Sequence, residues 1–176
     1  MTDYVAYAER NMVSPFDPAA DPDRHALWQR LVAADSDAFV AGDWAAIEGD
    51  FDAENFEGVR CGHSTDPADW RIAFPTLASY RDSWLEQSRQ FVARRFVGLT
   101  HRQGIYARTH LTRIDLAGDR ALCHKQFFGD LPLADGTLLT GRRQTLYRAH
   151  RRRGVWKVVG FLGQLPLRDD PDGRSA

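Results

Sequence analysis

Residues 104–128 read "GIYARTHLTRIDLAGDRALCHKQFF", and this stretch decides the fold. Two runs of strand-forming residues flank Ala117-Gly118, which predicts an antiparallel hairpin. Residues 133–165 read "LADGTLLTGRRQTLYRAHRRRGVWKVVGFLGQL". They predict two more strands, with turns at Asp135-Gly136 and near Arg152-Arg153.

The first half of the chain has helical spacing instead. One helix is predicted to begin after a cap at Asp23 and to end near residue 41. Its inner face is marked by residues spaced three or four apart, which are Trp28, Val32, Asp35 and Phe39. A further helix is predicted at about residues 77–96, where Leu77, Tyr80, Trp84 and Phe91 mark the buried face.

A Gly-Asp-Trp sequence at residues 42–44 interrupts the first helical pattern. Gly42 is suited to a C-terminal cap and Asp43 to the N-terminal cap of a second, short helix. We expect Trp44 to pack this joint. Helices followed by an antiparallel meander indicate an α+β domain with helices on one face of a curved sheet.

The sequence divides into an N-terminal arm (1–23), a folded domain (24–167) and a polar tail (168–176). The charge is balanced, with 23 Lys and Arg against 24 Asp and Glu. No overall field therefore favours nucleic acid or an acidic membrane. The first 24 residues lack the pattern of a signal peptide and no run is long enough to span a bilayer, so we expect a cytoplasmic protein.

Pairing the strands across the turns predicts which side chains share a face. A two-residue turn at Asp135-Gly136 places His124 opposite Tyr147. A turn at Arg152-Arg153 then places Tyr147 opposite Val158. The concave face covered by helices would hold Leu122, His124, Phe128, Arg143, Thr145, Tyr147, Trp156, Val158 and Leu162. The opposite face, where we expect a homodimer interface, would hold Lys125, Gln144, Leu146, Arg148, Lys157, Val159 and Phe161.

The position of His110 depends on the first hairpin. A three-residue loop over 117–119 puts His110 on the same face as His124. A two-residue loop puts the two histidines on opposite faces, because a slip of one residue reverses every side chain. The sequence leaves both possibilities open.

The order of these elements resembles the SnoaL-like branch of the nuclear-transport-factor-2-like (NTF2-like) superfamily. The likeness is carried by Gly-Asp-Trp between helices, by "RTHLTRIDLAGDRALCHKQF" and by the final strand "RGVWKVVGFL". It spans about residues 24–165. It implies a cystatin-like conical barrel, usually dimeric, with a deep apolar pocket. Members include scytalone dehydratase, bile-acid dehydratase, ketosteroid isomerase, polyketide cyclases and non-catalytic binding modules, so the fold alone does not give the function.

The same resemblance suggests site residues. His110 falls where the dehydratases carry a catalytic histidine, and His124 lies near the second histidine of scytalone dehydratase. That enzyme has a Tyr-Asp pair where this chain has Phe39 and Val40. Asp35, one turn earlier, is the nearest acid able to face the pocket, although it could instead lie at the edge of the apolar stripe.

We therefore predict a cofactor-independent lyase or isomerase that acts on a small hydrophobic cyclic carbonyl compound. His110, His124 and Asp35 would supply the acid and base. Tyr147 and Arg143 would bind oxygen atoms, and Trp156 and Phe39 would line the pocket. No spacing typical of a metal site or a phosphate loop is present, so we expect neither metal nor cofactor. The alternative is a non-catalytic small-molecule-binding protein or an accessory subunit with the same fold.

Overall fold

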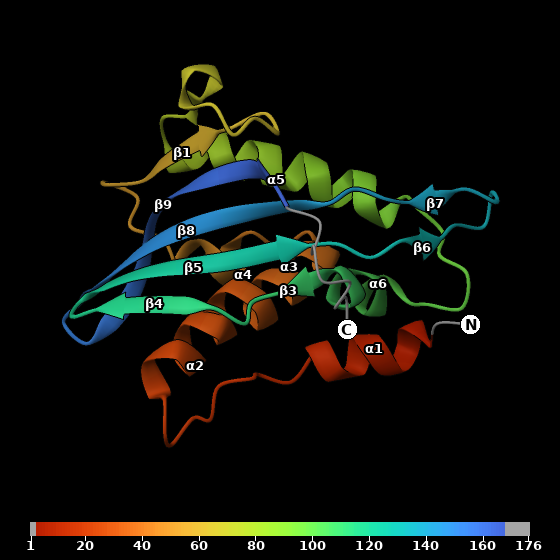
Figure 1. Cartoon of the computed structure of the whole chain (residues 1–176), viewed down its shortest axis with the longest axis horizontal. Helices are drawn as coiled ribbons and strands as arrows, with labels where there is room; N and C mark the ends of the chain where they lie inside the picture. Colours follow the sequence, from red (N-terminus) through yellow and green to blue (C-terminus); the bar gives the residue numbers. More distant parts are fainter. Residues whose placement is uncertain (1–2, 168–176) are drawn as a thin grey trace.

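The protein is built from a layer of helices against one face of a curved sheet (Figure 1). The computed structural model describes residues 3–167, and the tail predicted at 168–176 lies outside them. The α-helices are α1 (Tyr4–Asn11), α2 (Pro22–Trp28), α3 (Asp35–Ala41), α4 (Ala45–Glu48), α5 (Leu77–Val92) and α6 (His101–Arg108). A π-helical segment, η1 (Gln29–Ala34), joins α2 to α3, and a short 3-10 helix, η2 (Pro67–Asp69), lies between the first two strands.

Seven strands form the main sheet in the order β2-β1-β9-β8-β5-β3, with β4 also paired to β5. Their bounds are β1 (Glu57–Arg60), β2 (Arg71–Phe74), β3 (Thr109–His110), β4 (Ile114–Ala117), β5 (Arg120–Phe127), β8 (Arg143–Arg152) and β9 (Val155–Pro166). β1 runs parallel to β9 and the other pairs are antiparallel. A separate hairpin pairs β6 (Leu131–Pro132) with β7 (Leu138–Leu139). The predicted α+β class is confirmed.

The first long helical segment begins two residues earlier than predicted. Asp21, not Asp23, is its cap, because the Asp21 side chain accepts from the Arg24 N–H and Pro22 follows as the first helical residue. Gly42 ends the segment in the left-handed conformation, with φ of 66°, as predicted.

The Gly-Asp-Trp sequence is a joint between helices. The Asp43 carboxylate accepts from the Ala46 N–H, 3.3 Å away, at the start of α4. Trp44 is buried and its ring contacts those of Phe51, Tyr80 and Trp84. The predicted packing role of Trp44 is confirmed.

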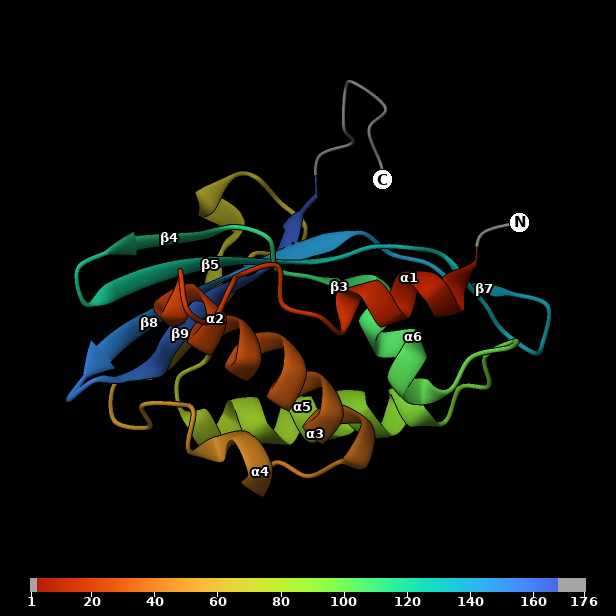
Figure 2. The ribbon, with the colours of Figure 1, turned by 90° about the horizontal axis from the view of Figure 1, so that it is seen from below.

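Residues 101–108 form a helix that the sequence analysis did not predict. Thr100 and Gln103 make a capping box, in which each side chain satisfies the backbone N–H of the other. The chain therefore turns into strand only at Thr109. α1, in the predicted N-terminal arm, packs against this helix (Figure 2).

The register predicted between β5 and β8 is wrong by one residue. Cys123, not His124, lies opposite Tyr147. The Asp135-Gly136 turn exists, but it closes the small β6–β7 hairpin rather than the β5–β8 connection. Residues 128–142 thus form a long arm. The slip places Lys125 on the inner face and His124 on the outer face.

The last hairpin also differs from the prediction. Its turn lies at Arg153-Gly154, and a bulge follows before Tyr147 pairs with Phe161. Phe161, predicted for the outer face, is therefore 5% exposed and packs on Tyr80 and Tyr147.

The inner face of the sheet and the helices share one apolar core. Figure 2 shows α3, α4 and α5 lying below the sheet. The core includes Trp28, Trp44, Trp84, Tyr106 and Trp156. No helix among residues 3–167 has the length and apolar character needed to cross a membrane.

Gly160 should be essential for the pairing of β1 with β9. Its φ is 154°, and a Cβ there would lie 2.2 Å from the Glu57 carbonyl oxygen. We expect Gly160→Ala to lower the free energy of unfolding by about 2–4 kcal/mol, measured by urea denaturation. Gly49→Ala is the control, since φ is −62° and a Cβ meets no atom within 4 Å. Equal stability of the two variants would contradict the steric argument.

Candidate active site

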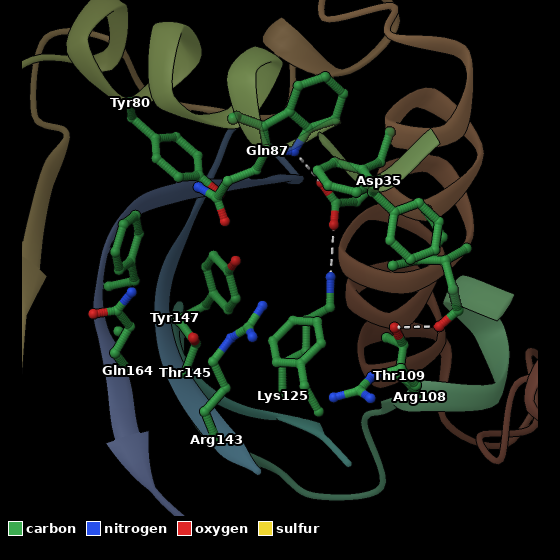
Figure 3. Close-up of a pocket in the computed structure, with 18 of the residues that line it drawn as sticks. Asp35, Tyr80, Gln87, Arg108, Thr109, Lys125, Arg143, Thr145, Tyr147 and Gln164 are labelled. Carbon is green, nitrogen blue, oxygen red and sulfur yellow. Dashed lines mark hydrogen bonds and ion pairs between the residues drawn. The ribbon is translucent and has the colours of Figure 1, made fainter. Parts of the chain in front are cut away.

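A cavity of about 390 Å³ lies between the helices and the inner face of the sheet (Figure 3). The helices contribute Asp35, Phe39, Tyr80, Trp84, Gln87, Phe91 and Ile105. The sheet contributes Lys125, Phe127, Arg143, Thr145, Tyr147 and Gln164. The lining thus combines aromatic and aliphatic side chains with many polar and charged ones.

A buried ion pair crosses the cavity from helix to sheet. Lys125 Nζ on β5 lies 2.6 Å from Asp35 Oδ2 at the start of α3. The Lys125 side chain is 2% exposed. Trp84 Nε1 donates to the other carboxylate oxygen, Asp35 Oδ1, at 3.0 Å. These two donors fix the orientation of the carboxylate, and Figure 3 shows it at the edge of the open space.

Two tyrosine hydroxyls face the same space. Tyr80 on α5 and Tyr147 on β8 both line the cavity, and both rings pack against Phe161. Burial raises the pKa of both phenols, and the nearby Asp35 carboxylate adds to the effect. Both hydroxyls are therefore protonated at neutral pH and can donate hydrogen bonds.

Two arginines line the sheet end of the cavity. Arg108 is 6% exposed, and its guanidinium donates to the carbonyls of Gly129, Leu139, Thr140 and Gly141. Burial, then the nearby Arg143, lowers the pKa of Arg108 to about 10. Burial also lowers the pKa of Arg143, whose guanidinium lies 4.8 Å from the centre of the Phe127 ring. Arg108 thereby fastens the 128–142 arm beside the cavity.

Four of the predicted site residues line the cavity: Asp35, Phe39, Arg143 and Tyr147. Phe39 packs its ring on those of Trp84 and Phe91. Trp156 is on the inner face but lies away from the cavity. It is 3% exposed and donates through Nε1 to Asp23 at 2.9 Å. The substrate contact predicted for Trp156 is therefore wrong, because this ring belongs to the core near the start of α2.

The two histidines predicted as the acid and base lie outside the cavity. His124 is on the outer face, where its Nε2 lies 3.1 Å from Asp115 Oδ2. The first hairpin has the two-residue loop Gly118-Asp119. With that loop alone, the two histidines would lie on opposite faces of the sheet. One extra residue between β3 and β4 reverses the alternation of side chains, so that His110 lies on the same face as His124. Both therefore point away from the cavity, and the predicted convergence is wrong.

His110 is enclosed by aromatic rings instead. Its ring stacks on Phe128 at 3.9 Å between centroids and lies 5.7 Å from that of Tyr7 on α1. Asn11 lies 3.5 Å from Nδ1, and Nε2 is buried with no hydrogen-bond partner among the described residues. Burial lowers the pKa of His110 to about 4. His110 is therefore neutral at physiological pH and serves to hold α1.

Sequence reasoning missed Lys125 as a site residue. A signal was present, because Cys123 and Phe127 lie two positions away on the same strand and mark an apolar face. A lysine in such a row needs a buried carboxylate. Tyr80 and Trp84 were recognised as buried, but their polar atoms were not connected with Asp35. No group of three His, Cys, Asp or Glu that could hold a metal occurs within the described part of the chain.

No protein-family model and no curated protein matches the sequence. Solved structures do match. An NTF-2 like protein of unknown function from Silicibacter pomeroyi is similar at 15% identity and a TM-score of 0.50, over 82% of this chain and 96% of that chain. A domain with a cystatin-like fold from Nostoc punctiforme is similar at 14% identity and a TM-score of 0.53, over 85% and 79%.

A third similar structure is a function-unknown protein from Mycobacterium tuberculosis, with 18% identity and a TM-score of 0.50 over 93% of this chain and 83% of that chain. Likeness at such identities concerns the fold. The chain has the NTF2-like, cystatin-like fold that the resemblance in sequence predicted.

The His110 environment predicts a pH-dependent stability. The histidine has a pKa of about 4 when folded and 6.5 as a free side chain, so the unfolded chain binds more protons between these values. Burial of the neutral ring contributes its full share to the free energy of unfolding above pH 6.5. That contribution is lost as the pH falls toward 4, because the unfolded chain takes up the proton first. At pH 5 the loss amounts to about 2 kcal/mol.

Urea denaturation at pH 7 and pH 5 measures this loss. His110→Phe keeps a ring in the aromatic enclosure but cannot bind a proton, and the carboxylates titrate alike in both proteins. The variant should therefore lose about 2 kcal/mol less than the wild-type chain between the two pH values. Equal losses would show that His110 is not buried in its neutral form.

Proposed function

We propose that this protein is a cofactor-independent lyase or isomerase that moves a proton on a small hydrophobic carbonyl compound held in the cavity. One observation carries the proposal. The Asp35 carboxylate and the hydroxyls of Tyr80 and Tyr147 face the same cavity from different elements (Figure 3). These are the two groups that removal of a proton alpha to a carbonyl requires.

Asp35 is the proposed base. A carboxylate has about four lone-pair positions, and the described contacts with Lys125 and Trp84 occupy one on each oxygen. The remaining positions are available to a substrate proton. Because both oxygens are held, the carboxylate is already oriented when the substrate arrives, which lowers the entropic cost of reaction.

Tyr147 is the proposed oxyanion donor. Its phenol is protonated at neutral pH because burial raises its pKa. The hydroxyl proton is available to the substrate oxygen, on which negative charge develops as the proton leaves carbon. A fixed donor of this kind typically contributes about 10²–10³ in rate. Lys125 would add a positive charge beside the same site.

The cavity also supplies a place for the apolar body of the substrate. Phe39, Phe91, Ile105 and Phe127 line it. These side chains would exclude water and orient a ring system against Asp35. The predicted catalytic roles of His110 and His124 form no part of this proposal, since neither lines the cavity.

A specific feature favours a second candidate, non-catalytic binding of a small molecule. The ammonium of Lys125 lies directly on Asp35, and an opposite charge makes a carboxylate a weaker base. If the ion pair persists with ligand bound, the cavity would bind a molecule without changing it.

Deuterium exchange distinguishes the two candidates without knowledge of the natural substrate. The chain in D₂O is incubated with 1-tetralone, 2-decalone or cyclohexanone, and loss of the alpha protons is followed by NMR. We expect exchange faster than in buffer for at least one ketone. Asp35→Asn should reduce it about 10²-fold or more, since a positioned base contributes at least that much.

Asp115→Asn is the matched control, because it makes the same chemical change on an exposed carboxylate beside His124. It should exchange the ketones at the wild-type rate. Exchange no faster than in buffer, or equal rates for the two asparagine variants, would contradict proton transfer by Asp35.

A further inference from the structure

The cavity has an excess of positive charge. Its lining contains five cationic side chains, which are Arg60, Arg94, Arg108, Lys125 and Arg143. Asp35 is the one carboxylate among the described lining residues. Since the whole chain has balanced charge, this concentration is a local property of the cavity.

The ion pair of Asp35 is with Lys125 and not with any of the arginines. Arg60 lies over the Phe74 ring and Arg143 over the Phe127 ring. Arg108 is satisfied by carbonyl oxygens, which accept its hydrogen bonds without cancelling its charge. None of these three forms an ion pair with any residue between 3 and 167. Positive charge removed from water without a counter-charge is unfavourable, and an anionic ligand would offset that cost.

Arg143 has the geometry of an anchor. Its guanidinium lies over the Phe127 ring and lines the cavity (Figure 3). Thr145 lies two residues further along β8, on the same face. A planar guanidinium matches a carboxylate through two parallel hydrogen bonds.

A backbone irregularity brings Gln164 beside this pair. Gly163 and Gln164 on β9 together oppose Thr145, since the register shifts between Gln144 and Leu146. Gln164 has φ of 59°, an unfavourable value for a residue with a side chain. The structure thus accepts strain at a cavity-lining amide, and such strain is concentrated at functional sites.

We propose that the ligand of this cavity carries a carboxylate, which Arg143 binds with Thr145 and Gln164. This inference rests on the proposed function for the position of the site and adds the chemical class of the ligand. The carboxylate would occupy the sheet end, and the apolar skeleton would extend past Phe127 toward Asp35 and Tyr147 (Figure 3).

Calorimetric titration with two matched probes tests the inference. 2-Naphthoate carries the carboxylate, and 2-naphthamide has nearly the same shape but no charge. We expect the wild-type chain to bind the acid about 10- to 100-fold more tightly, as hydrogen bonds between charged groups imply. Arg143→Gln should remove this preference. Equal affinity for the two probes, or binding of neither, would overturn the inference.

Arg148→Gln is the control, because Arg148 lies on the same strand but is exposed and is 3.9 Å from Glu57. It should keep the preference for the acid. If the Arg143→Gln variant still prefers 2-naphthoate to 2-naphthamide, another cationic side chain binds the carboxylate. That result would overturn the role of Arg143. Near-UV circular dichroism establishes that each variant is folded.

The outcomes separate this inference from the proposed function. Ketone exchange by a chain that binds both naphthyl probes equally would leave proton transfer standing and remove the carboxylate ligand. A preference for the acid without ketone exchange would leave a binding protein for hydrophobic carboxylates.

Discussion

The ion pair between Asp35 and Lys125 joins the helical layer to the inner face of the sheet. A lysine that is 2% exposed is compatible with folding only when a carboxylate lies beside it. Because Lys125 must reach Asp35, the face of β5 that carries Lys125 turns toward the helices. For the same reason the first residue of α3 lies next to β5. Trp84 binds the same carboxylate, so α5 is held to the pair as well. Three elements distant in sequence thus meet at one polar point, and the cavity extends from it.

The helical half of the chain was largely predictable, because its signals are local. Apolar spacing identified the segment ending at Gly42 and the long helix beginning at Leu77. α6 was missed, since the capping box of Thr100 and Gln103 precedes a segment of weak amphipathic pattern. Strand existence was also predictable. Strand register was not, because it depended on residues 128–142, whose turn signal at Asp135-Gly136 belongs to a hairpin of its own.

That one-residue error explains which site residues were found. The sequence placed Asp35, Arg143 and Tyr147 in the cavity, where the structure has them. The apolar pattern of the helix or strand that carries each residue was enough to show which side faces the core. The histidines were assigned by likeness to dehydratases, and position in a strand does not fix the face when a bulge intervenes. Lys125 was placed outside by the same slip that placed His124 inside. The fold thus follows from patterns along the chain, whereas the site follows from pairings between distant segments.

A cavity with Asp35, two tyrosine hydroxyls and several arginines that form no ion pair with residues 3–167 favours a hydrophobic ligand with an anionic group. A crystal structure of the chain with 2-naphthoate tests this account most directly. The account predicts the carboxylate on the Arg143 guanidinium and the rings inside the cavity, with Asp35 facing a ring carbon. A naphthoate bound beside His110 or His124, or one that displaces Asp35 from Lys125, would contradict it.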